Sequence, residues 1–352
     1  MRPESEIELA EIIRTAKFPV TPIGGASRLR PGEGQGSHID LTGISGVTLY
    51  EPEALTLVAR AGTPLAEINR ILAAEGQMLA FEPDARAGST IGGIAASNAS
   101  GPRRVQVGAC RDAMLGVRFV TGEGEIVKNG GRVMKNVTGY DLVKLMAGSR
   151  GTLGILTEIS LKTAPIPPAS RLLALRGLDP QTAIAALTEA LTGPFDISAA
   201  GWLAGEGAVI RLEGLAGSVD LRSRAIGTSL ARFGQITEVD PALAAQLVPS
   251  RAPVGDLWRI LCLPTQAPAL LKALPQPLAV DWGGGLIWVA LPEGELPVLP
   301  EFQGQATRMT GQDPHDLPAM NPVVARLNDS LRAKFDPRSI FAGTSGHAGK
   351  SA

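Results

Sequence analysis

Apolar residues recur along the first 168 positions with two periods, one typical of helices and the other typical of strands. Residues 4–16 place apolar side chains three and four positions apart, as an amphipathic helix does. Residues 55–60 form an apolar strand, and the helix after it is expected to begin behind Pro64 and to end at Gly76. The pattern also predicts a strand at 20–23, a hairpin at 113–121 and 124–128, a short helix at 141–146 and a strand at 154–162.

A different pattern follows residue 168, and it occurs twice. Each copy has the order strand, helix, strand, strand, which is how a ferredoxin-like unit begins, and two such units could share one sheet. The first copy spans 172–233 and the second spans 257–291, with one more strand at 305–309. A final helix is expected at 323–335, because Pro337 disfavours the helical conformation in the residue before it.

Three of the four residues 165–168 are proline, which suits a stiff connection between domains. A chain of 352 residues is also longer than a single hydrophobic core usually supports. We therefore predict an α+β protein with a first domain at 1–168 and a ferredoxin-like second domain, containing an internal repeat, at 169–312. A C-terminal helix and tail at 313–352 would return to the first domain.

The composition disfavours several classes of protein. A net charge of −1 without a long run of one sign argues against nucleic-acid binding, which needs a basic face. The N-terminal sequence lacks the apolar segment of a secretory signal, and no apolar run approaches the ~18 residues of a membrane span. The two cysteines, Cys110 and Cys262, are too few for a disulfide framework or a cysteine-ligated iron–sulfur cluster. We expect a cytoplasmic protein.

Glycine is over-represented: the chain has 42, which is roughly 12% of its residues against roughly 7% in ordinary proteins. The first cluster, 22–28, follows a strand and offers convergent backbone N–H groups, the hydroxyl of Ser27 and the positive charge of Arg28. Such a loop suits an anion, although a plain turn can have the same sequence. It matches neither the dinucleotide-binding fingerprint nor the P-loop.

The second glycine cluster, 88–101, is more informative. Apart from Ile91, Ile94 and Asn98, its side chains are tiny or small hydroxyls. We interpret the run as neither a good core segment nor a flexible linker, but as a backbone that lies along a flat, phosphate-bearing ligand. A close crossing of two packed elements is the alternative. A third cluster, 148–155, opens a strand and is weak evidence by itself.

In this order, the motifs resemble those of the vanillyl-alcohol oxidase (PCMH-type) FAD-binding family, and more closely those of the E subunits of bacterial glycolate oxidases. The resemblance covers nearly all of residues 1–168 and the last helix. It implies a two-subdomain PCMH-type FAD-binding domain followed by a ferredoxin-like cap. The motifs that carry it are GSTIGGIAASNASGPRR, RDAMLGVRFVTGEGEIVKNGGRV, KNVTGYDLVKLMAGSRGTLGIL and RLNDSLRAKFDPRSIF.

The resemblance implies a set of FAD-binding residues. In this family the first loop wraps the pyrophosphate, the second segment follows the pyrophosphate and the flavin ring, and the third closes on the adenine side. Some relatives attach the flavin to a histidine beside the first loop, where this chain has Ala26 and Ser27, so the resemblance implies non-covalent FAD. The matching residues are Gly24, Gly25, Ala26, Ser27 and Arg28; Pro83, Gly88, Ser89, Thr90, Ile91, Gly92, Gly93, Asn98, Ser100 and Gly101; and Gly151, Thr152, Gly154 and Ile155.

Oxidation of a 2-hydroxy acid requires a cation for the carboxylate and a base for the hydroxyl proton. Arg259, in an otherwise apolar strand, is the main candidate for the cation, and an ion pair with Asp256 or Asp281 is the alternative. Arg211 is a second candidate, and Tyr140 is a candidate proton relay. The three histidines, His38, His315 and His347, lack metal-ligand spacing, so we predict no metal site.

The resemblance implies an FAD-dependent oxidoreductase that acts as one subunit of a glycolate (2-hydroxy acid) dehydrogenase complex. Glycolate would be oxidised to glyoxylate, beside a catalytic flavoprotein subunit and an iron–sulfur subunit that takes the electrons. The complex could hold the chain at the inner face of the membrane. Two alternatives stay open: a non-catalytic, FAD-stabilised assembly subunit, and a self-sufficient flavin oxidase of another small hydroxy acid or alcohol.

One position and one segment depart from the family pattern. Many relatives have glutamate where this chain has Arg150, and we expect that residue at the surface. After Pro337 relatives continue with Asn-Pro-Gly-Arg, whereas residues 342–346 here are Ala-Gly-Thr-Ser-Gly.

Overall fold

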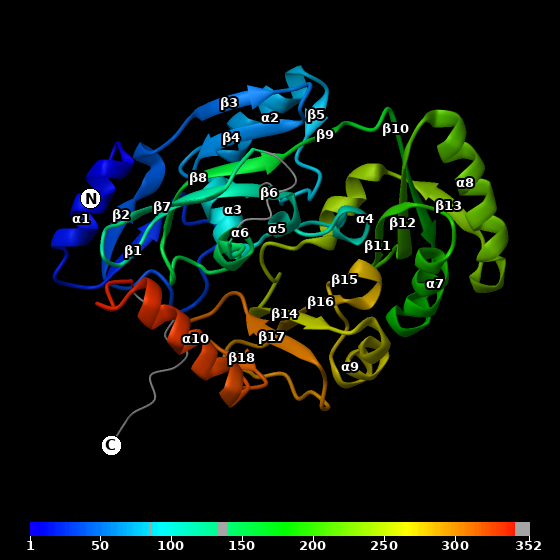
Figure 1. Cartoon of the computed structure of the whole chain (residues 1–352). Coiled ribbons are helices and arrows are strands. Elements are labelled where there is room, and N and C mark those ends of the chain that lie inside the picture. The colour runs from blue at the N-terminus through cyan, green and yellow to red at the C-terminus, as the bar shows by residue number, and fades with distance from the viewer. Residues whose placement is uncertain (85, 133–138, 342–352) are drawn as a thin grey trace. The chain divides into compact units, whose positions relative to one another are not determined.

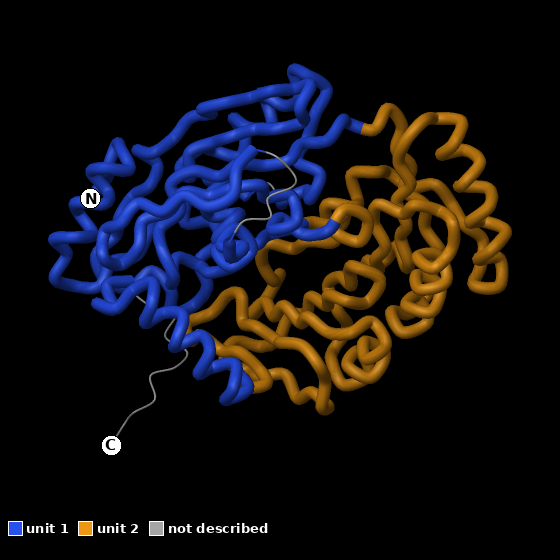
Figure 2. Tube along the Cα trace, viewed as in Figure 1, with its two compact units in different colours: residues 1–100, 108–166, 320–352 blue, residues 101–107, 167–319 orange. Residues whose placement is uncertain are grey.

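The computed structural model describes residues 1–84, 86–132 and 139–341. Its backbone divides into two compact units (Figure 2). Some sequence-based expectations fall outside the described residues. They concern residues 342–346, His347 and the first four residues of the motif that begins at Lys135. Unit 1 comprises Met1–Ser100, Gly108–Ile166 and Met320–Ala352, and unit 2 comprises Gly101–Val107 and Pro167–Ala319.

The first part of unit 1 is a helix packed on a small parallel sheet (Figure 1). The helix α1 (Glu6–Thr15) begins at Ser5, whose hydroxyl accepts a hydrogen bond of 3.1 Å from the N–H of Glu8. Its apolar side chains share a core with β1 (Val20–Ile23) and β2 (Ser37–Asp40), which pair in parallel. The end of β1 leads directly into the first glycine cluster.

The second part of unit 1 is an antiparallel five-stranded sheet with the order β3-β4-β8-β6-β7. Helices pack their apolar residues on this sheet, and the last helix of the chain joins the same core through Phe335, whose ring centroid lies 6.0 Å from that of Phe119. The strands are β3 (Val47–Glu51), β4 (Thr56–Arg60), β8 (Ile155–Lys162), β6 (Met114–Val120) and β7 (Ile126–Gly130). The helices are α2 (Leu65–Ala74), α3 (Ile91–Ser97), α5 (Cys110–Ala113), α6 (Leu142–Met146) and α10 (Pro322–Phe335), with β5 (Gln77–Met78) and β9 (Ala164–Pro165) as a separate pair.

Unit 2 is built on a nine-stranded antiparallel sheet with the order β13-β10-β12-β11-β15-β16-β14-β17-β18. The first four strands and α7 and α8 form a ferredoxin-like unit, and β14 to β17 repeat its strand order with α9 as the single α-helix between these described strands. The two repeats join where β11 pairs with β15. The elements are β10 (Ala169–Leu175), α7 (Pro180–Thr192), β11 (Ile197–Leu203), β12 (Gly207–Gly214), α8 (Ala216–Ser229), β13 (Ile236–Val239), β14 (Asp256–Cys262), α9 (Ala267–Ala273), β15 (Ala279–Asp281), β16 (Leu286–Leu291), β17 (Gly304–Arg308) and β18 (Asp316–Leu317).

The two faces of the nine-stranded sheet differ. One face packs on α7, α8 and α9 in a large apolar core. The opposite face has a smaller apolar cluster that includes Leu257 and Trp288, and strand alternation places Arg259 on this face, two residues after Leu257. The segment Gly101–Val107, which contains the short helix α4 (Arg104–Val107), packs with β11 and belongs to this unit.

The structure confirms the predicted α+β fold class, with ferredoxin-like topology in unit 2. The interpretation that the glycine cluster 88–101 is not a good core segment is wrong: it contains the helix α3, and Ile91, Ile94 and Ala95 are fully buried in the core of unit 1. Small residues there allow close helix packing. Apolar periodicity gave no indication of the strands β2, β3 and β13, because each is short and partly exposed. Among the described helices, none is both long and apolar enough to cross a membrane.

Candidate functional site

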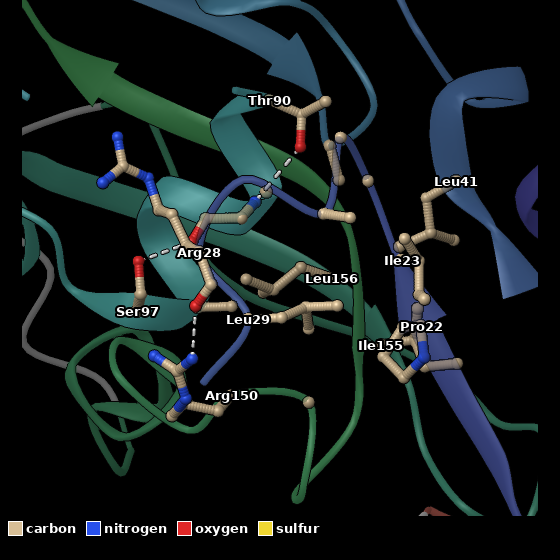
Figure 3. A pocket seen from close by; sticks show the side chains of 18 of the residues that line it. Pro22, Ile23, Arg28, Leu29, Leu41, Thr90, Ser97, Arg150, Ile155 and Leu156 are labelled. Atoms are coloured by element: carbon tan, nitrogen blue, oxygen red, sulfur yellow. Dashed lines mark hydrogen bonds between the residues drawn. The ribbon is translucent and has the colours of Figure 1, made fainter. Parts of the chain in front are cut away.

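A pocket in unit 1 brings together parts of all three glycine clusters (Figure 3). One wall is the loop from Pro22 to Leu29, which follows β1. A second wall is α3 with the residue before it, and the third is the turn that leads from Arg150 into β8. The lining residues that carry the argument below are Gly24, Gly25, Ala26, Ser27, Arg28, Glu33, Thr90, Gly92, Gly93, Ser97, Arg150, Gly151, Gly154 and Ile155.

Glycine is required where these segments cross. A Cβ atom built on Gly25 would lie 1.5 Å from the carbonyl oxygen of Gly88, and one on Gly24 would lie 2.2 Å from the Oγ1 of Thr90. A Cβ on Gly92 would lie 2.8 Å from both the Cβ and the carbonyl oxygen of Ala61. Close crossing of packed elements, the alternative left open by the sequence, therefore explains these glycines. Their packing places the first loop directly beside α3.

The helix α3 is fixed at both ends. The hydroxyl of Thr90 accepts a hydrogen bond of 3.3 Å from the N–H of Gly93, and Asn98 ends the helix in the left-handed conformation with φ = 48°. The hydroxyl of Ser97 donates to the carbonyl oxygen of Gly93 at 2.7 Å. Because Thr90, Gly92, Gly93, Ala96 and Ser97 line the pocket, this wall presents backbone, a methyl group and two small hydroxyls.

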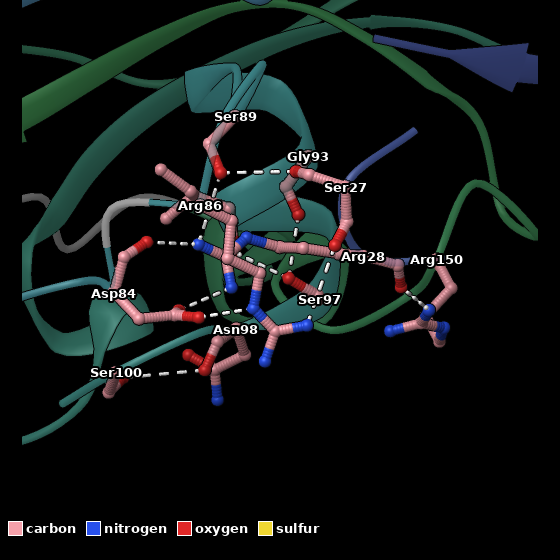
Figure 4. A network of polar contacts seen from close by, with 11 residues as sticks. Ser27, Arg28, Asp84, Arg86, Ser89, Gly93, Ser97, Asn98, Ser100 and Arg150 are labelled. Atoms are coloured by element: carbon pink, nitrogen blue, oxygen red, sulfur yellow. Dashed lines mark hydrogen bonds and ion pairs between the residues drawn. The ribbon is translucent and has the colours of Figure 1, made fainter. Parts of the chain in front are cut away.

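Arg28 is the positive charge in the first wall, and it is held by an ion pair (Figure 4). Its guanidinium pairs with the carboxylate of Asp84, which also pairs with Arg86, and its Nη2 donates to the carbonyl oxygen of Asp84 at 2.6 Å. The Nε of Arg28 is buried and has no hydrogen-bond partner among the described residues. Burial lowers the pKa of Arg28, against the opposing effect of Asp84. The pocket wall thus contains a desolvated cation with one unused donor.

Arg150 does not lie at the surface, so that expectation is wrong. Its side chain is 19% exposed, forms an ion pair with Glu33 and donates to the carbonyl oxygen of Arg28 at 2.6 Å. Arg30 also binds Glu33, at 3.0 Å. Burial acts to raise the pKa of Glu33, but hydrogen bonding and charge from Arg150, with help from Arg30, outweigh it and lower that pKa. Nothing in the local sequence signals this pair, since its members are 117 positions apart.

Several residues that the family resemblance implicates lie outside the pocket lining. Ile91 belongs to the core, Ser89 is buried against Ser27 with 3.1 Å between the hydroxyl oxygens, and Asn98 accepts from the N–H of Arg111 at 2.9 Å. The others in this group are Pro83, Gly88, Ser100, Gly101 and Thr152. Of these, the Ser100 hydroxyl accepts from the N–H of Cys110 at 2.8 Å, Thr152 donates to the Ser149 carbonyl at 2.7 Å, and Gly101 belongs to unit 2.

The candidate catalytic residues lie elsewhere. Arg259, on β14, has its guanidinium carbon 5.7 Å from the ring centroid of Trp282 and 5.9 Å from that of Trp288. Arg211 is buried, 3.4 Å from the carboxylate of Glu213. Tyr140 is 88% exposed.

The described histidines do not form a metal site. His38 is exposed and bonds the carbonyl oxygen of Gly34 at 2.7 Å, and His315 packs edge-on against Trp258. Within the described ranges, no group of three or more histidine, cysteine, aspartate or glutamate side chains is arranged to hold a metal ion.

Comparisons with known proteins identify the family of this chain. Residues 1–130 match the family model described as an FAD binding domain. Over 333 residues, the chain is 38% identical to the glycolate oxidase subunit GlcE of Escherichia coli, covering 92% of this chain and 91% of that protein. The chain belongs to the GlcE family. The sequence motifs predicted this family relationship, and the identity over nearly the whole chain confirms it.

More distant relatives match about half of the chain. The mitochondrial D-lactate dehydrogenase [cytochrome] of Arabidopsis thaliana is 34% identical over 48% of this chain and 30% of its own length. The glycolate oxidase subunit GlcD of Bacillus subtilis is 32% identical over 49% of this chain and 38% of its own length. A solved structure of alkyldihydroxyacetonephosphate synthase has the same fold, with a TM-score of 0.67 over 97% of this chain and 76% of that one, at 16% identity.

FAD is the cofactor of this domain, and the pocket suits it. The pocket has a polar wall for the phosphate groups of FAD and an apolar wall for its flat rings. Arg28 has an unused buried donor for a phosphate oxygen, and the glycine backbone allows close approach. Ile23, Leu41 and Ile155 supply an apolar surface for a flat ring.

Proposed function

We propose that this GlcE-family chain is the FAD-binding subunit of a complex that oxidises glycolate, or a closely related 2-hydroxy acid, to the corresponding 2-oxo acid. The observation that supports this most strongly is the convergence of three separate glycine clusters on one pocket with a buried arginine. The similarity to a glycolate oxidase subunit, which extends over nearly the whole chain, supports the substrate class.

The residues of the pocket would bind FAD without a covalent bond. Gly24 to Arg28 would hold the pyrophosphate, the α3 wall would follow it toward the flavin, and Gly151 to Ile155 would close on the adenine side. Asn98 and the small residues around it would complete the site in the positions that the family resemblance assigns. FAD, when bound, supplies an acceptor for the two electrons removed from the substrate.

In the second unit, Arg259 would bind the substrate carboxylate. A guanidinium presents two parallel N–H groups to two carboxylate oxygens, and the flanking indoles keep it partly out of water. Tyr140 is the proposed proton relay for the hydroxyl group. The domain division at 168 and 313 is part of the same proposal, with the second unit as a cap.

The proposed partners are a catalytic flavoprotein subunit and an iron–sulfur subunit. The relatives named GlcE and GlcD are both described as subunits, which supports a multi-subunit assembly. We propose a cytoplasmic location, at the inner face of the membrane when the partners are bound. Electrons would leave through the iron–sulfur subunit, since the two cysteines of this chain cannot ligate a cluster.

A non-catalytic assembly role is the second candidate. One observation favours it: no histidine lies among the residues that line the described pocket, and the candidate relay Tyr140 is almost fully exposed. FAD would then stabilise the fold for partner binding. Oxidation of substrate would take place on another subunit.

One set of experiments separates these functions. The purified full-length chain is expected to show an oxidised flavin spectrum, and acid should release intact FAD. Anaerobic addition of glycolate is then followed by flavin absorbance. Bleaching by the chain alone would eliminate the assembly role, whereas no bleaching, with activity restored on mixing with the partner subunits, would eliminate a self-sufficient oxidase. A colourless protein that takes up no added FAD would overturn the proposal.

A further inference from the structure

Arg150 lies where the three walls of the pocket in unit 1 meet. Its backbone N–H donates to the carbonyl oxygen of Ala96 at 2.9 Å, which joins it to α3. Its Nη2 donates to the carbonyl oxygen of Arg28 at 2.6 Å, and the same guanidinium pairs with Glu33, which joins it to the first loop. Its backbone is in the left-handed region, with φ = 53°. An arginine keeps this strained conformation only where its surroundings fix it.

One nitrogen of this guanidinium is left for a ligand. Nε and Nη2 bind Glu33, whereas Nη1 has no hydrogen-bond partner among the described residues and is not buried. The side chain is 19% exposed and lines the pocket. In Arg28, by contrast, both terminal nitrogens bind Asp84, and the remaining Nε is buried. Arg150 therefore has the more accessible donor of these two arginines.

The backbone of the first loop also has donors beside this nitrogen. The carbonyl oxygen of Ser27 accepts from Arg86 at 3.4 Å and that of Arg28 accepts from Arg150, so two arginines bind consecutive carbonyl groups of the loop. The N–H groups of Ala26, Ser27 and Arg28 have no acceptor among the described residues. Free N–H groups on successive loop residues are typical of a site for a phosphate oxygen.

We propose that Arg150 binds the diphosphate of FAD directly through Nη1, while its other nitrogens hold the first loop. Figure 3 shows Arg150 on the side of the pocket where Arg28 and Ser97 lie, away from the apolar Leu41. Bonds from a guanidinium to phosphate oxygens are charge-assisted and are stronger than neutral hydrogen bonds. This inference rests on the FAD site of the proposed function, and it adds a binding residue at a position where the family pattern has glutamate.

The test compares ligands that differ only in the diphosphate. The full-length chain, freed of FAD, is titrated with FAD, ADP and adenosine, and binding is followed by flavin fluorescence or by calorimetry. Because ADP and adenosine share the base and the sugar, the ratio of their affinities isolates the phosphate contacts. Loss of one charge-assisted contact weakens binding by roughly ten- to a hundredfold. The preference for ADP over adenosine should therefore fall by that factor in Arg150→Gln, together with the affinity for FAD.

Glu33→Gln separates a direct contact from a role in holding the loop. It removes the ion pair between the loop and Arg150 but leaves the guanidinium in the chain. If Arg150 acted only by holding the loop, Arg150→Gln and Glu33→Gln would show the same preference for ADP over adenosine. A direct contact predicts that the preference falls in Arg150→Gln alone. Arg70→Gln, at an exposed position on α2, is the matched control and should keep the wild-type preference.

Two results for the variants would overturn the inference: a wild-type preference in Arg150→Gln, or an equal fall in Arg150→Gln and Glu33→Gln. A wild-type chain that binds ADP no more tightly than adenosine would overturn it as well. Thermal midpoints show whether each variant is folded. If Arg150→Gln does not fold, Arg150→Lys carries the test, because one ammonium group cannot bind Glu33 and a phosphate as a forked guanidinium does. The preference should fall in Arg150→Lys too, and an unchanged preference would remove the contact.

Failure of the proposed function would give a different result. If FAD and ADP bind as expected but no 2-hydroxy acid reduces the flavin in the assembled complex, the substrate assignment fails and the role of Arg150 stands. A chain that neither holds FAD nor takes it up would overturn both the FAD-binding subunit and the contact from Arg150.

Discussion

The carbonyl oxygen of Gly88 occupies the space where a side chain on Gly25 would begin, 1.5 Å from an ideal Cβ position. This contact joins the first two glycine clusters and sets the distance between the first loop and α3. The atom in the way is backbone, so it cannot rotate aside as a side chain could. Any substitution of Gly25 must therefore separate the two walls of the pocket.

Gly25→Ala is expected to abolish stoichiometric FAD uptake. Forcing one extra methyl group into this contact should cost about 1–3 kcal/mol in the free energy of unfolding. Flavin absorbance after gel filtration measures the first effect, and denaturant unfolding measures the second. Gly131→Ala is the control, because a Cβ there has no neighbour within 4 Å. If Gly25→Ala binds FAD with normal affinity, then FAD binding does not require the close contact between Gly25 and Gly88.

Arg150→Ala is expected to weaken FAD binding by about 1–3 kcal/mol, because a charged, half-buried donor to Glu33 and to the first loop is lost. Fluorescence titration of the apoprotein with FAD gives the dissociation constant. Arg70→Ala, on the exposed side of α2, provides the control and should bind FAD normally.

The partner of Arg150 is tested by a double-mutant cycle with Glu33→Ala. Since the two side chains act as one pair, their combined effect on FAD affinity should be smaller than the two single effects added together. Strict additivity would mean that the pair does not hold the first loop.

The pH dependence of stability should contain a contribution from Glu33. Burial opposes ionisation of this carboxyl, but Arg150 and Arg30 lower its pKa below the ordinary value of 4.5. A lowered pKa in the folded state contributes stability that is present above the unfolded-state pKa and is lost as the pH falls through the folded-state pKa. Wild type should therefore exceed Glu33→Gln in unfolding free energy at pH 6, and the difference should shrink below pH 4.5. If the difference in unfolding free energy between wild type and Glu33→Gln does not change with pH, it comes from packing and not from the charge of Glu33.

Arg259→Gln is expected to raise the dissociation constant for glycolate by roughly ten- to a hundredfold, through the loss of a charge-assisted contact. FAD content should be unchanged, because Arg259 belongs to unit 2 and the FAD pocket belongs to unit 1. Anaerobic titration of the holoprotein, or of the assembled complex, measures the change. Arg251→Gln, at an exposed arginine before β14, is the control. Equal affinity in Arg259→Gln and wild type would remove Arg259 from the site.

Much of the fold could be predicted from apolar periodicity. The helices α1, α2 and α7 and the strands of both repeats except β13 were predicted within a few residues, because each buries one continuous face. The helix α3 was missed because its glycine and alanine residues give no amphipathic pattern, and its helical conformation depends on packing against Ala61 and its neighbours. In the same way, Arg150 was misplaced, because its burial depends on a glutamate in a distant loop.

The sequence by itself indicated the class of ligand: the glycine clusters, with Ser27 and Arg28 beside them, suited a phosphate-bearing molecule, and the resemblance of the ordered motifs to a known family implied FAD. Only the tertiary structure decided which of those residues line one pocket, and it added the pairs Arg150–Glu33 and Arg259–Trp282. The reason is physical. Local sequence sets backbone preference and periodic burial, whereas an ion pair or a ring contact depends on where two remote segments meet, and each partner has an ordinary local sequence.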